Sequence, residues 1–328
     1  MDTLNVALVG YGGIAEFHAN ALARIDGICL KTLVGRRPEP SESFAGKHGF
    51  ASVVTNYDAV LNDPEIDAVV ITAPSEFHHE MTSGALDAGK HVLCEIPLAM
   101  SHKGACEIIG KVKSSGRQCL VAHTRRYSPG GRFIRDFIGS GKTGQVYLHT
   151  NYEYWLRHQN VGWTGYQRSW VDDVLFHHGC HLVDFSLWAV GAPVRRVRGE
   201  LSPLHPETGT SMDVAMLIRY ANETAATISL SYNATKGAKA NLFVCEAGTL
   251  VDEGSRVTLN GDTVFESTDS LQENIVRQDT DFVQAVREGR KPLCNETDGL
   301  AALAVLQQVY DQMITLEDEE KYRRRWGL

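Results

Sequence analysis

The chain has 328 residues, of which 43% are hydrophobic and 22% are charged, a composition typical of a globular protein long enough for two domains. The formal net charge of -8 argues against non-specific binding to nucleic acid phosphates, which requires a basic surface. Seven cysteines occur without a C-x-x-C pair, so we expect buried thiols in a reducing compartment.

The first 122 residues alternate predicted strands with predicted helices. Strands are predicted at 5–10, 29–35, 68–72, 91–94 and 118–122, and helices at 15–25, 40–48, 77–88 and 103–115. Apolar runs without alternation, separated by helices, are typical of a parallel sheet covered on both faces. Right-handed crossovers then predict a doubly wound α/β Rossmann domain over residues 1–122. Neither a secretory signal nor an apolar stretch of about 20 residues is found, so we expect a cytoplasmic protein with no membrane contact.

From about residue 123 the pattern changes to the apolar–polar alternation of an antiparallel sheet. Strands are predicted at 146–155, 195–201, 211–220, 225–232 and 241–247, and a hairpin through Gly261-Asp262 joins 257–260 to 263–266. Helices are predicted at 171–190, 275–288 and 297–315. We therefore expect an α+β second domain over residues 123–328, with the helix at 297–315 packing back on the first domain. The basic run at 323–326 is a solvated terminus or a subunit contact.

The turn after the first strand reads Gly10-Tyr11-Gly12-Gly13-Ile14-Ala15. Gly10 permits a tight turn, Gly12 lets the backbone approach a pyrophosphate, and Ala15 allows close packing of the helix on the strand. The N–H groups at the helix N-terminus are then offered to the anion. A purely structural turn is the alternative, but the strand–turn–helix setting favours binding of a dinucleotide by Gly10, Gly12, Gly13 and Ile14.

The second strand ends in Val34-Gly35-Arg36-Arg37, and no acid follows until Glu39. An acid at this place binds the ribose 2′-OH of NAD. Two guanidinium groups would instead bind the 2′-phosphate of NADP with charge-assisted hydrogen bonds. The alternative is a solvated surface pair. We expect NADP as the cofactor, with NAD still possible.

The next two strand ends supply further residues to the crevice where a dinucleotide lies. The first carries Thr72, Pro74 and His78, and the second carries Glu95 and Pro97. Glu95 is placed to orient the nicotinamide ribose or ring. The sequence leaves open whether the bond before Pro97 is cis.

The strand at 118–122 leads into His123-Thr124-Arg125-Arg126, and Arg168-Ser169-Trp170 follows later. Arginines just beyond a strand end resemble a clamp for carboxylates. An ordinary surface pair is the alternative. We expect Arg125, Arg126 and Arg168 to bind an anionic substrate, with His123 and Trp170 beside them.

The densest cluster of titratable residues is Phe176-His177-His178-Gly179-Cys180-His181-Leu182-Val183-Asp184. On an α-helix His177 and His181 share a face, and Asp184 follows three residues later. The spacing is compatible with a metal, but hydride transfer to a nicotinamide requires none, so no metal is expected. We expect His181 to act as general base, with His177 or His178 as alternatives and Asp184 orienting the ring. A satisfied core histidine is the structural alternative.

These motifs together resemble those of the Gfo/Idh/MocA oxidoreductases over essentially the whole chain. The resemblance implies a second domain built on a large open, mostly antiparallel sheet, with substrate between that sheet and the nicotinamide. Most members carry E-K-P where this chain has Glu95-Ile96-Pro97, and L-x-D-x-G-x-H-x-x-D where this chain has His177 in place of the first Asp. Both departures weaken the transfer of a sugar dehydrogenase mechanism.

The runs at 95–99, 123–126, 168–170 and 177–184 resemble a subgroup with the same departures. That resemblance implies NADP-dependent oxidation of a cyclic hemiacetal to a dicarboxylate product, which would explain the three arginines. A sugar or polyol dehydrogenase and a non-catalytic, cofactor-sensing binding protein are the alternatives. The expected partners are a small-molecule substrate and, through the open sheet, further copies in a homodimer or homotetramer.

Overall fold

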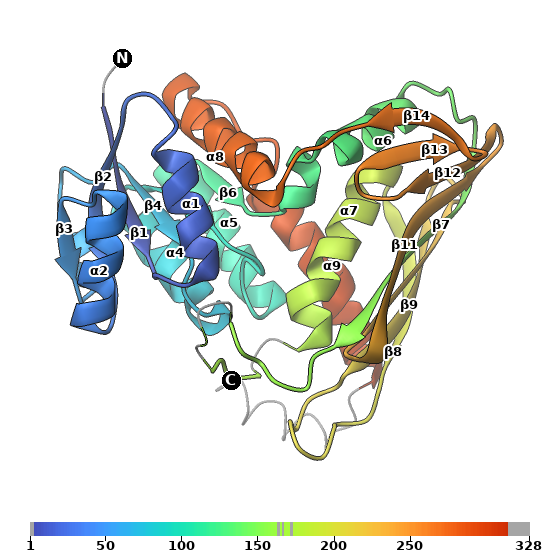
Figure 1. Cartoon of the computed structure of the whole chain (residues 1–328), viewed down its shortest axis with the longest axis horizontal. Coiled ribbons are helices and arrows are strands. Elements are labelled where there is room, and N and C mark those ends of the chain that lie inside the picture. The colour runs from blue at the N-terminus through green and yellow to red at the C-terminus, as the bar shows by residue number, and fades with distance from the viewer. Residues whose placement is uncertain (1–2, 163–164, 166, 171–172, 314–328) are drawn as a thin grey trace. The chain divides into compact units, whose positions relative to one another are not determined.

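A computed structural model describes residues 3–162, 165, 167–170 and 173–313. The chain forms two compact units (Figure 1). Unit 1 consists of Met1–Thr124, Val161–Arg168 and Ser270–Leu300, and unit 2 consists of Arg125–Asn160, Ser169–Asp269 and Ala301–Leu328. A single boundary after residue 122 does not describe this division, because a late segment of the chain returns to unit 1.

Unit 1 contains a six-stranded parallel sheet with the order β3-β2-β1-β4-β5-β6. Its strands are β1 (Leu4–Val9), β2 (Ile28–Val34), β3 (Ser52–Val54), β4 (Ala68–Ile71), β5 (His91–Cys94) and β6 (Cys119–Val121). The strand order reverses between β1 and β4, which is where ligands bind in doubly wound sheets. The predicted Rossmann fold is confirmed.

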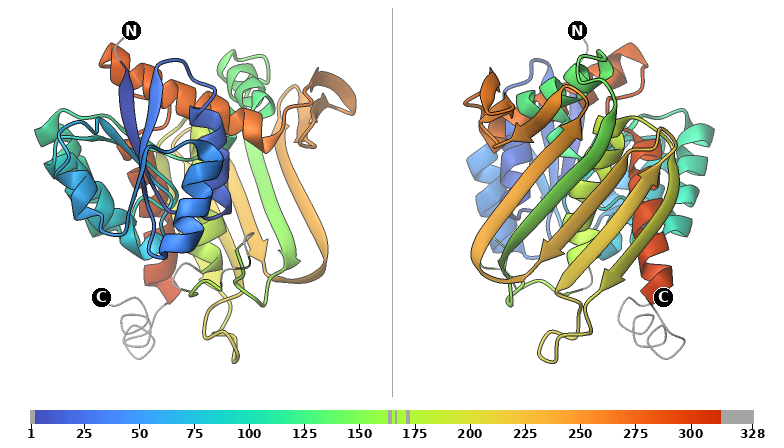
Figure 2. Two further views of the ribbon diagram at one scale, coloured as in Figure 1. Left: turned by 60° about the vertical axis from the view of Figure 1, so that its left-hand side comes forward. Right: turned by 90° about the vertical axis from the view of Figure 1, so that its right-hand side faces the viewer.

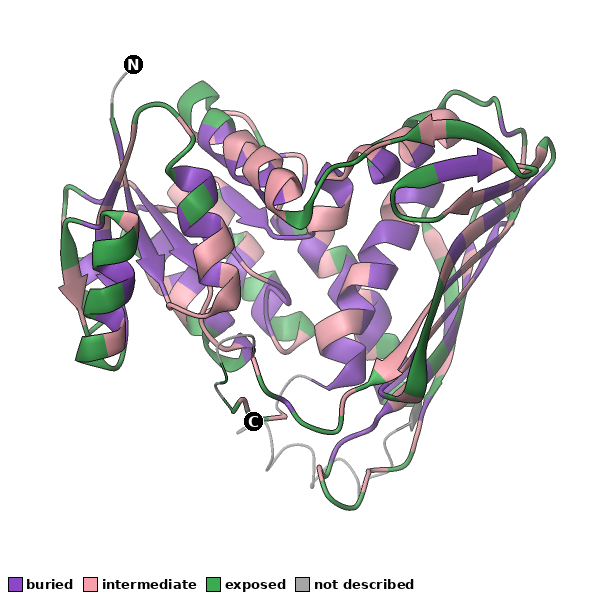
Figure 3. Ribbon diagram, in the orientation of Figure 1, coloured by how far each residue is buried: buried purple, intermediate pink, exposed green. Residues whose placement is uncertain are grey.

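The helices of unit 1 are α1 (Gly13–Leu22), α2 (Pro38–His48), α3 (Asp58–Leu61), α4 (His78–Asp87), α5 (His102–Ser115) and α8 (Leu271–Glu288). Strands β1, β4, β5 and β6 are almost entirely buried, whereas the edge strand β3 is exposed or half-buried (Figure 3). Sequence analysis missed β3 and α3, because three or four residues are too few to show a period.

Helix α8 lies far along the chain but belongs to unit 1, where it packs against α1. Ile275, Phe282 and Val283 on α8 are fully buried. The last helix, α9 (Glu296–Met313), begins in unit 1 and continues into unit 2. The final two residues of the predicted helix 297–315, and the basic run at 323–326, lie outside the described residues.

Unit 2 contains an eight-stranded sheet with the order β14-β13-β12-β11-β7-β10-β9-β8. Its strands are β7 (Val146–Leu156), β8 (Val194–Leu201), β9 (Asp213–Tyr220), β10 (Ala225–Ser231), β11 (Asn233–Cys245), β12 (Gly248–Asp252), β13 (Arg256–Leu259) and β14 (Asp262–Glu266). Neighbouring strands are antiparallel except β10 and β7, which are parallel. The expectation of a large, mostly antiparallel sheet is confirmed.

The broad face of this sheet is visible in Figure 2, right, with the helices of unit 2 behind it. In β9 buried and partly exposed residues alternate, which places one face of the strand in the core and the other toward solvent. Tyr147 and Leu217 are 53% and 38% exposed. Among the described residues, the covering helices therefore lie on one face of the sheet.

Several predicted elements of unit 2 differ from the structure. The hairpin between β13 and β14 turns at Asn260-Gly261, where both φ angles are positive, and not at Gly261-Asp262. An Asn-Gly pair adopts such a turn readily. Sequence analysis also missed β12 and α6 (Pro129–Gly139), since Gly130 and Gly131 disfavour a helix. The side chain of Ser128 caps α6 by accepting a hydrogen bond from Gly131 N, and Pro129 suits its first turn.

The predicted helix 171–190 has two parts, and residues 171 and 172 lie outside the described residues. Asp173 caps a π-helical segment, η3 (Val174–Gly179), by accepting hydrogen bonds from Leu175 N and Phe176 N. The α-helix α7 (Cys180–Val190) follows. A π-helical turn takes more residues than an α-helical turn, so the facial alignment expected for His177 and His181 does not follow from α-helical spacing.

No helix within the described residues is long and apolar enough to span a membrane. All seven cysteines are described, and no disulfide joins them. Five are buried as expected, whereas Cys106 is exposed and Cys29 is half-buried.

Candidate active site

The glycine turn of unit 1 has the shape that a dinucleotide requires. Gly10 has φ of 104°, and a Cβ atom there would lie 2.6 Å from Thr72 Oγ1, so both conformation and space require glycine. A Cβ at Gly12 would meet nothing within 4 Å. Gly12 caps α1 without a side-chain hydrogen bond. The space over the N-terminus of α1 is therefore open, which fits a pyrophosphate.

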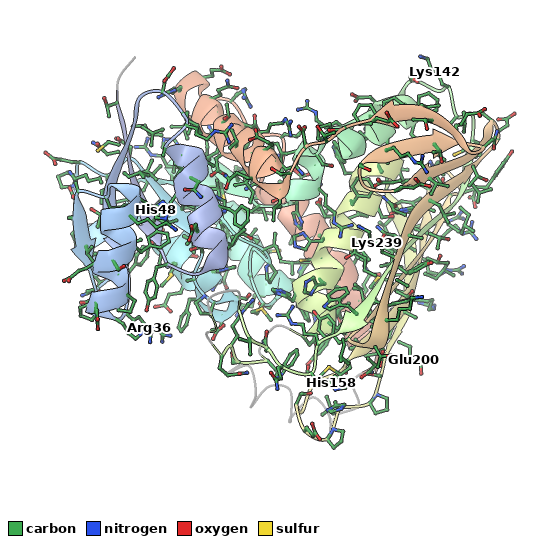
Figure 4. The ribbon with its side chains drawn as sticks, viewed as in Figure 1. Arg36, His48, Lys142, His158, Glu200 and Lys239 are labelled. Atoms are coloured by element: carbon green, nitrogen blue, oxygen red, sulfur yellow. The ribbon has the colours of Figure 1, made fainter. Side chains whose placement is uncertain are left out.

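The end of β2 lies beside this turn. A Cβ at Gly35 would lie 2.8 Å from the ring of Tyr11, and the Tyr11 hydroxyl accepts a hydrogen bond of 3.2 Å from Arg37 Nε. Arg36 and Arg37 are exposed just before α2, and Figure 4 labels Arg36 at this end of the helix. Two cations thus accompany the glycine turn where the 2′-position of a dinucleotide is bound in this fold.

The ends of β4 and β5 are joined by His78, the first residue of α4. His78 Nδ1 lies 2.7 Å from the Pro97 carbonyl oxygen, and Nε2 lies 2.8 Å from the Ala73 carbonyl oxygen. Carbonyls only accept hydrogen bonds, so both ring nitrogens donate and the imidazole is a cation. Burial alone lowers the pKa of His78, but Cys94 and the two carbonyls raise it to about 9. The Ile96–Pro97 bond is cis.

Sequence analysis missed two residues that hold Glu95, which follows β5. His18 on α1 places Nε2 3.0 Å from Glu95 Oε1 and Nδ1 2.9 Å from Asp279 Oδ2. His18 follows the buried Ala15 by three residues, and this spacing on one helix face could have indicated it. Asp279 lies on α8, 261 residues beyond His18, so no local pattern could have indicated it.

In unit 2 the three predicted histidines occupy the junction of η3 with α7. The ring centroids of His177 and His178 lie 4.3 Å apart, and those of His178 and His181 lie 6.5 Å apart. His178 Nδ1 is hydrogen-bonded to the hydroxyl of Tyr232, which is buried. Burial, with the neighbouring charges of His177 and Arg157, holds the pKa of His178 well below its usual range, so this ring is neutral near pH 7.

Aromatic rings and a guanidinium surround His178. The ring of Trp155 lies 4.6 Å from His178 and 5.2 Å from Tyr232. The Arg157 guanidinium lies 5.5 Å from the Tyr232 ring centroid and 6.0 Å from that of Trp170. Of the expected residues, Trp170 belongs to this group together with His178 and its neighbour His177. Sequence analysis missed Trp155 on β7, Arg157 directly after β7, and Tyr232 directly after β10, because these residues are far apart along the chain.

Arg126 and Asp184 form a different arrangement from the one expected. Arg126 Nε and Nη2 donate to the two Asp184 carboxylate oxygens at 2.9 and 2.6 Å, and both side chains are buried. The expectation was that Arg126 binds substrate and that Asp184 orients His181. A buried guanidinium that donates two hydrogen bonds to one carboxylate is typical of a structural ion pair, and this pair links the residues just before α6 to α7.

The remaining expected residues are divided between the units. Arg125 is one-third exposed, and its Nη2 donates to Glu153 on β7. His123, directly after β6, is buried in unit 1, and Arg168 also belongs to unit 1. No group of three or more His, Cys, Asp and Glu side chains within the described residues could hold a metal.

Comparison with known proteins defines the class to which this fold and these residues belong. Residues 4–123 match the model of the oxidoreductase family with NAD-binding Rossmann fold, Gfo/Idh/MocA, and residues 129–264 match that of the bacterial oxidoreductases, C-terminal. The chain therefore belongs to the Gfo/Idh/MocA family, whose members include sugar and polyol dehydrogenases. It is a nicotinamide-dependent dehydrogenase.

Individual relatives give finer likenesses. The chain is 33% identical over 295 residues to 4-carboxy-2-hydroxymuconate-6-semialdehyde dehydrogenase of Sphingobium sp. (strain NBRC 103272 / SYK-6), with 88% of this chain and 92% of the relative covered. It is 26% identical to inositol 2-dehydrogenase of Acidothermus cellulolyticus over 70% of this chain and 67% of that protein. The structure of levoglucosan dehydrogenase with NADH and L-sorbose superposes with a TM-score of 0.85 at 21% identity, covering 98% of both chains, which establishes the fold.

Proposed function

We propose that the chain oxidises a small cyclic, anionic hemiacetal with NADP, and that its substrate is the hemiacetal of 4-carboxy-2-hydroxymuconate-6-semialdehyde. The product would be the lactone 2-pyrone-4,6-dicarboxylate. The observation that carries this proposal is the 33% identity to the dehydrogenase of that semialdehyde over 88% of the chain. Most members of the family have a lysine where this chain has Ile96. Ile96 is buried and apolar, which supports a reaction that does not use this lysine.

Oxidation of a hemiacetal to a lactone removes a hydride from the ring carbon and a proton from its hydroxyl. Bound NADP would accept the hydride. The chain must supply a base for the hydroxyl proton and donors for the carboxylates. A hemiacetal hydroxyl is more acidic than an ordinary alcohol, so a neutral imidazole suffices as base.

His181 is the proposed general base, and His178 is the alternative. The environment of His178 supports a role for this neutral ring in proton transfer, because Tyr232 holds its Nδ1. When the phenol accepts from Nδ1–H, Nε2 presents its lone pair. His177, whose ring lies 4.3 Å from that of His178, would then adjust the basicity of the cluster.

The proposed anion contacts come from Arg125, Arg157 and Arg168. Arg126 is not included among these proposed contacts because it pairs with Asp184. Arg157 is included because its guanidinium lies against Tyr232 and Trp170, beside the histidines. Trp170 would pack against the flat ring of the substrate, and His123 would lie at the edge of the cofactor unit.

In unit 1 the proposed cofactor contacts are those of the glycine turn and the strand ends. Gly10, Gly12, Gly13 and Ile14 would hold the pyrophosphate, and Arg36 and Arg37 would hold the 2′-phosphate. Thr72, Pro74, His78, Glu95 and Pro97 would shape the nicotinamide pocket. The open space at Gly12 supports this assignment.

Steady-state assays that follow nicotinamide absorbance test the proposal. The protein with NADP should oxidise the hemiacetal and leave inositol and levoglucosan unchanged. His181→Ala should lower turnover at least about 100-fold, the usual effect of losing a general base. His102→Gln, on the exposed face of α5, should leave turnover unchanged.

Three results would contradict the proposal or part of it. Turnover of neutral sugars in place of the hemiacetal would make the chain a sugar or polyol dehydrogenase, and cofactor binding with no turnover would favour a sensor. If His181→Ala keeps near-normal turnover and His178→Gln loses most of it, His178 is the general base.

We also propose that the face of the unit 2 sheet opposite its described helices binds another copy of the chain. The partly exposed apolar side chains on its strands, Tyr147 and Leu217 among them, support this. Light scattering should then give the mass of a dimer or tetramer.

A further inference from the structure

Three ionisable side chains meet beneath the proposed nicotinamide pocket, and the mechanism above leaves two of them without a role. His18 comes from α1, Asp279 from α8, and Glu95 from the end of β5. His18 and Asp279 are fully buried, while the Glu95 side chain is 14% exposed. Glu95 is therefore the member of this group that reaches the surface.

The hydrogen bonds of His18 determine its protonation state. Nδ1 lies 2.9 and 3.1 Å from the two carboxylate oxygens of Asp279, and Nε2 lies 3.0 Å from Glu95 Oε1. Carboxylates are acceptors, so each ring nitrogen must carry a proton to bond its partner. Burial alone lowers the pKa of His18, but Asp279 and Glu95 raise it to about 10.

The group is anchored on its far side. Gln278 Nε2 donates to Asp279 Oδ1 at 3.4 Å, and Gln278 Oε1 accepts from the hydroxyl of Thr124 at 2.8 Å. On the near side, Glu95 Oε2 accepts a hydrogen bond of 3.2 Å from Ile96 N. Both oxygens of Glu95 are thus held in orientation.

We infer that His18 is a positioning residue: as a doubly protonated imidazolium held by Asp279, it keeps Glu95 ionised and aligned to accept hydrogen bonds from the nicotinamide ribose. This inference rests on the proposed cofactor site. It adds that an aspartate from α8 sets the orientation of a carboxylate at the end of β5. His18 touches neither substrate nor cofactor and acts through Glu95.

The protonation state can be read directly by NMR of protein labelled with ¹⁵N-histidine. At pH 8 without cofactor, both nitrogens of His18 should show the shifts of N–H groups. His149 provides an internal reference, because burial lowers its pKa to about 4 and one of its nitrogens should be of the pyridine type. A pyridine-type nitrogen in His18 would overturn the inference.

Two substitutions separate the two ends of the ring. In His18→Asn the side-chain amide takes the place of Nδ1, so the hydrogen bond to Asp279 is kept and the one to Glu95 is lost. In His18→Gln the amide takes the place of Nε2, so the hydrogen bond to Glu95 is kept. Loss of a charged hydrogen bond to Glu95 should raise the Kd for NADP about tenfold or more in the Asn variant. The Gln variant should stay within about threefold of the wild type. Equal affinities in the wild type and the Asn variant would overturn the positioning role.

Glu95→Gln supplies the matched comparison. If His18 acts through Glu95, adding His18→Asn to Glu95→Gln should change the Kd little further, whereas independent roles would give additive losses. Thermal unfolding of each variant excludes a simple loss of fold. Cofactor titration and NMR need no substrate, so failure of the hemiacetal assay leaves this test intact, and failure here leaves the assay intact.

Discussion

We propose that the two arginines after β2 determine which dinucleotide the protein prefers. Arg36 and Arg37 are exposed, and Arg37 is held by the Tyr11 hydroxyl next to the glycine turn. Each charge-assisted hydrogen bond to a phosphate contributes about 1.5–3 kcal/mol. Replacing both with alanine should therefore raise the Kd for NADP at least tenfold, at about 1.4 kcal/mol per tenfold, and leave that for NAD nearly unchanged.

Fluorescence titration with each cofactor measures this preference. Lys103→Ala removes a cation that is 87% exposed on α5 and should change neither Kd. An unchanged ratio of the two constants in the double alanine variant would show that the arginines do not read the 2′-phosphate.

The buried ion pair between Arg126 and Asp184 should be essential to unit 2. Asp184→Asn leaves the buried guanidinium without its counter-charge, which typically costs about 3–5 kcal/mol in the free energy of unfolding. Chemical denaturation measures this loss. Arg195→Gln breaks the surface pair with Glu223, whose side chains are more than 60% exposed, and should have almost no effect. If Asp184→Asn changes the free energy of unfolding only slightly, the ion pair is not essential to unit 2, and the original assignment of Asp184 as the residue that orients His181 is favoured.

Sequence analysis indicated those candidate residues whose neighbours lie close along the chain. The glycine turn, the paired arginines and the histidine run are local patterns that follow from one strand end or one helix. Asp279 and Tyr232 were missed because their partners lie 261 and 54 residues away. Arg125 and Arg126 have the same local context, so only packing separates the one-third exposed side chain from the buried one.

At the level of elements, the buried parallel strands were the easiest to predict, since apolar runs of four to seven residues alternate with helices. The elements that were missed or misread are those stabilised by few residues. Helix α6 depends on its Ser128 cap despite Gly130 and Gly131. The π-helical segment η3 depends on hydrogen bonding that no sequence period specifies.

A polar network connects α7 to the sheet of unit 2 and should make this unit sensitive to acid. His149 on β7 bonds Ser186 Oγ on α7 and Asn241 Oδ1 on β11, both at 2.8 Å, and its ring stacks on Phe243 at 4.1 Å. Burial lowers its pKa from 6.5 to about 4. As pH falls below 6.5 the unfolded chain therefore binds a proton that the folded chain resists.

The contribution of His149 is complete above pH 6.5 and is lost as pH falls toward 4. The full loss is on the order of 3 kcal/mol in the free energy of unfolding. Urea denaturation at several pH values between 7 and 4.5 measures this slope. His149→Gln removes the titrating group and should flatten the slope over that range. An equal slope in this variant would assign the acid sensitivity to other groups.

At the scale of the whole molecule, the chain leaves unit 1 after Thr124, contributes Val161–Arg168 to it, and returns to it again with α8. The return segment supplies the buried face of Ile275, Phe282 and Val283 and the partner of His18. It also covers the edge of the parallel sheet, because Val121 N donates to the Cys294 carbonyl oxygen at 3.2 Å. Unit 1 is therefore complete only with residues 270–300.

This division predicts how fragments of the chain behave. Residues 1–124 alone would expose the face of α1 that packs on α8 and would leave His18 without Asp279, so this fragment should aggregate or be cleaved readily by proteases. Joining 270–300 to it through a flexible linker should restore a single cooperative unfolding transition, observed by circular dichroism. The same fusion with Asp279→Ala should unfold at a lower temperature, because a buried imidazolium then lacks one counter-charge. A fragment 1–124 that unfolds cooperatively at the temperature of the fusion would show that α8 is dispensable for unit 1.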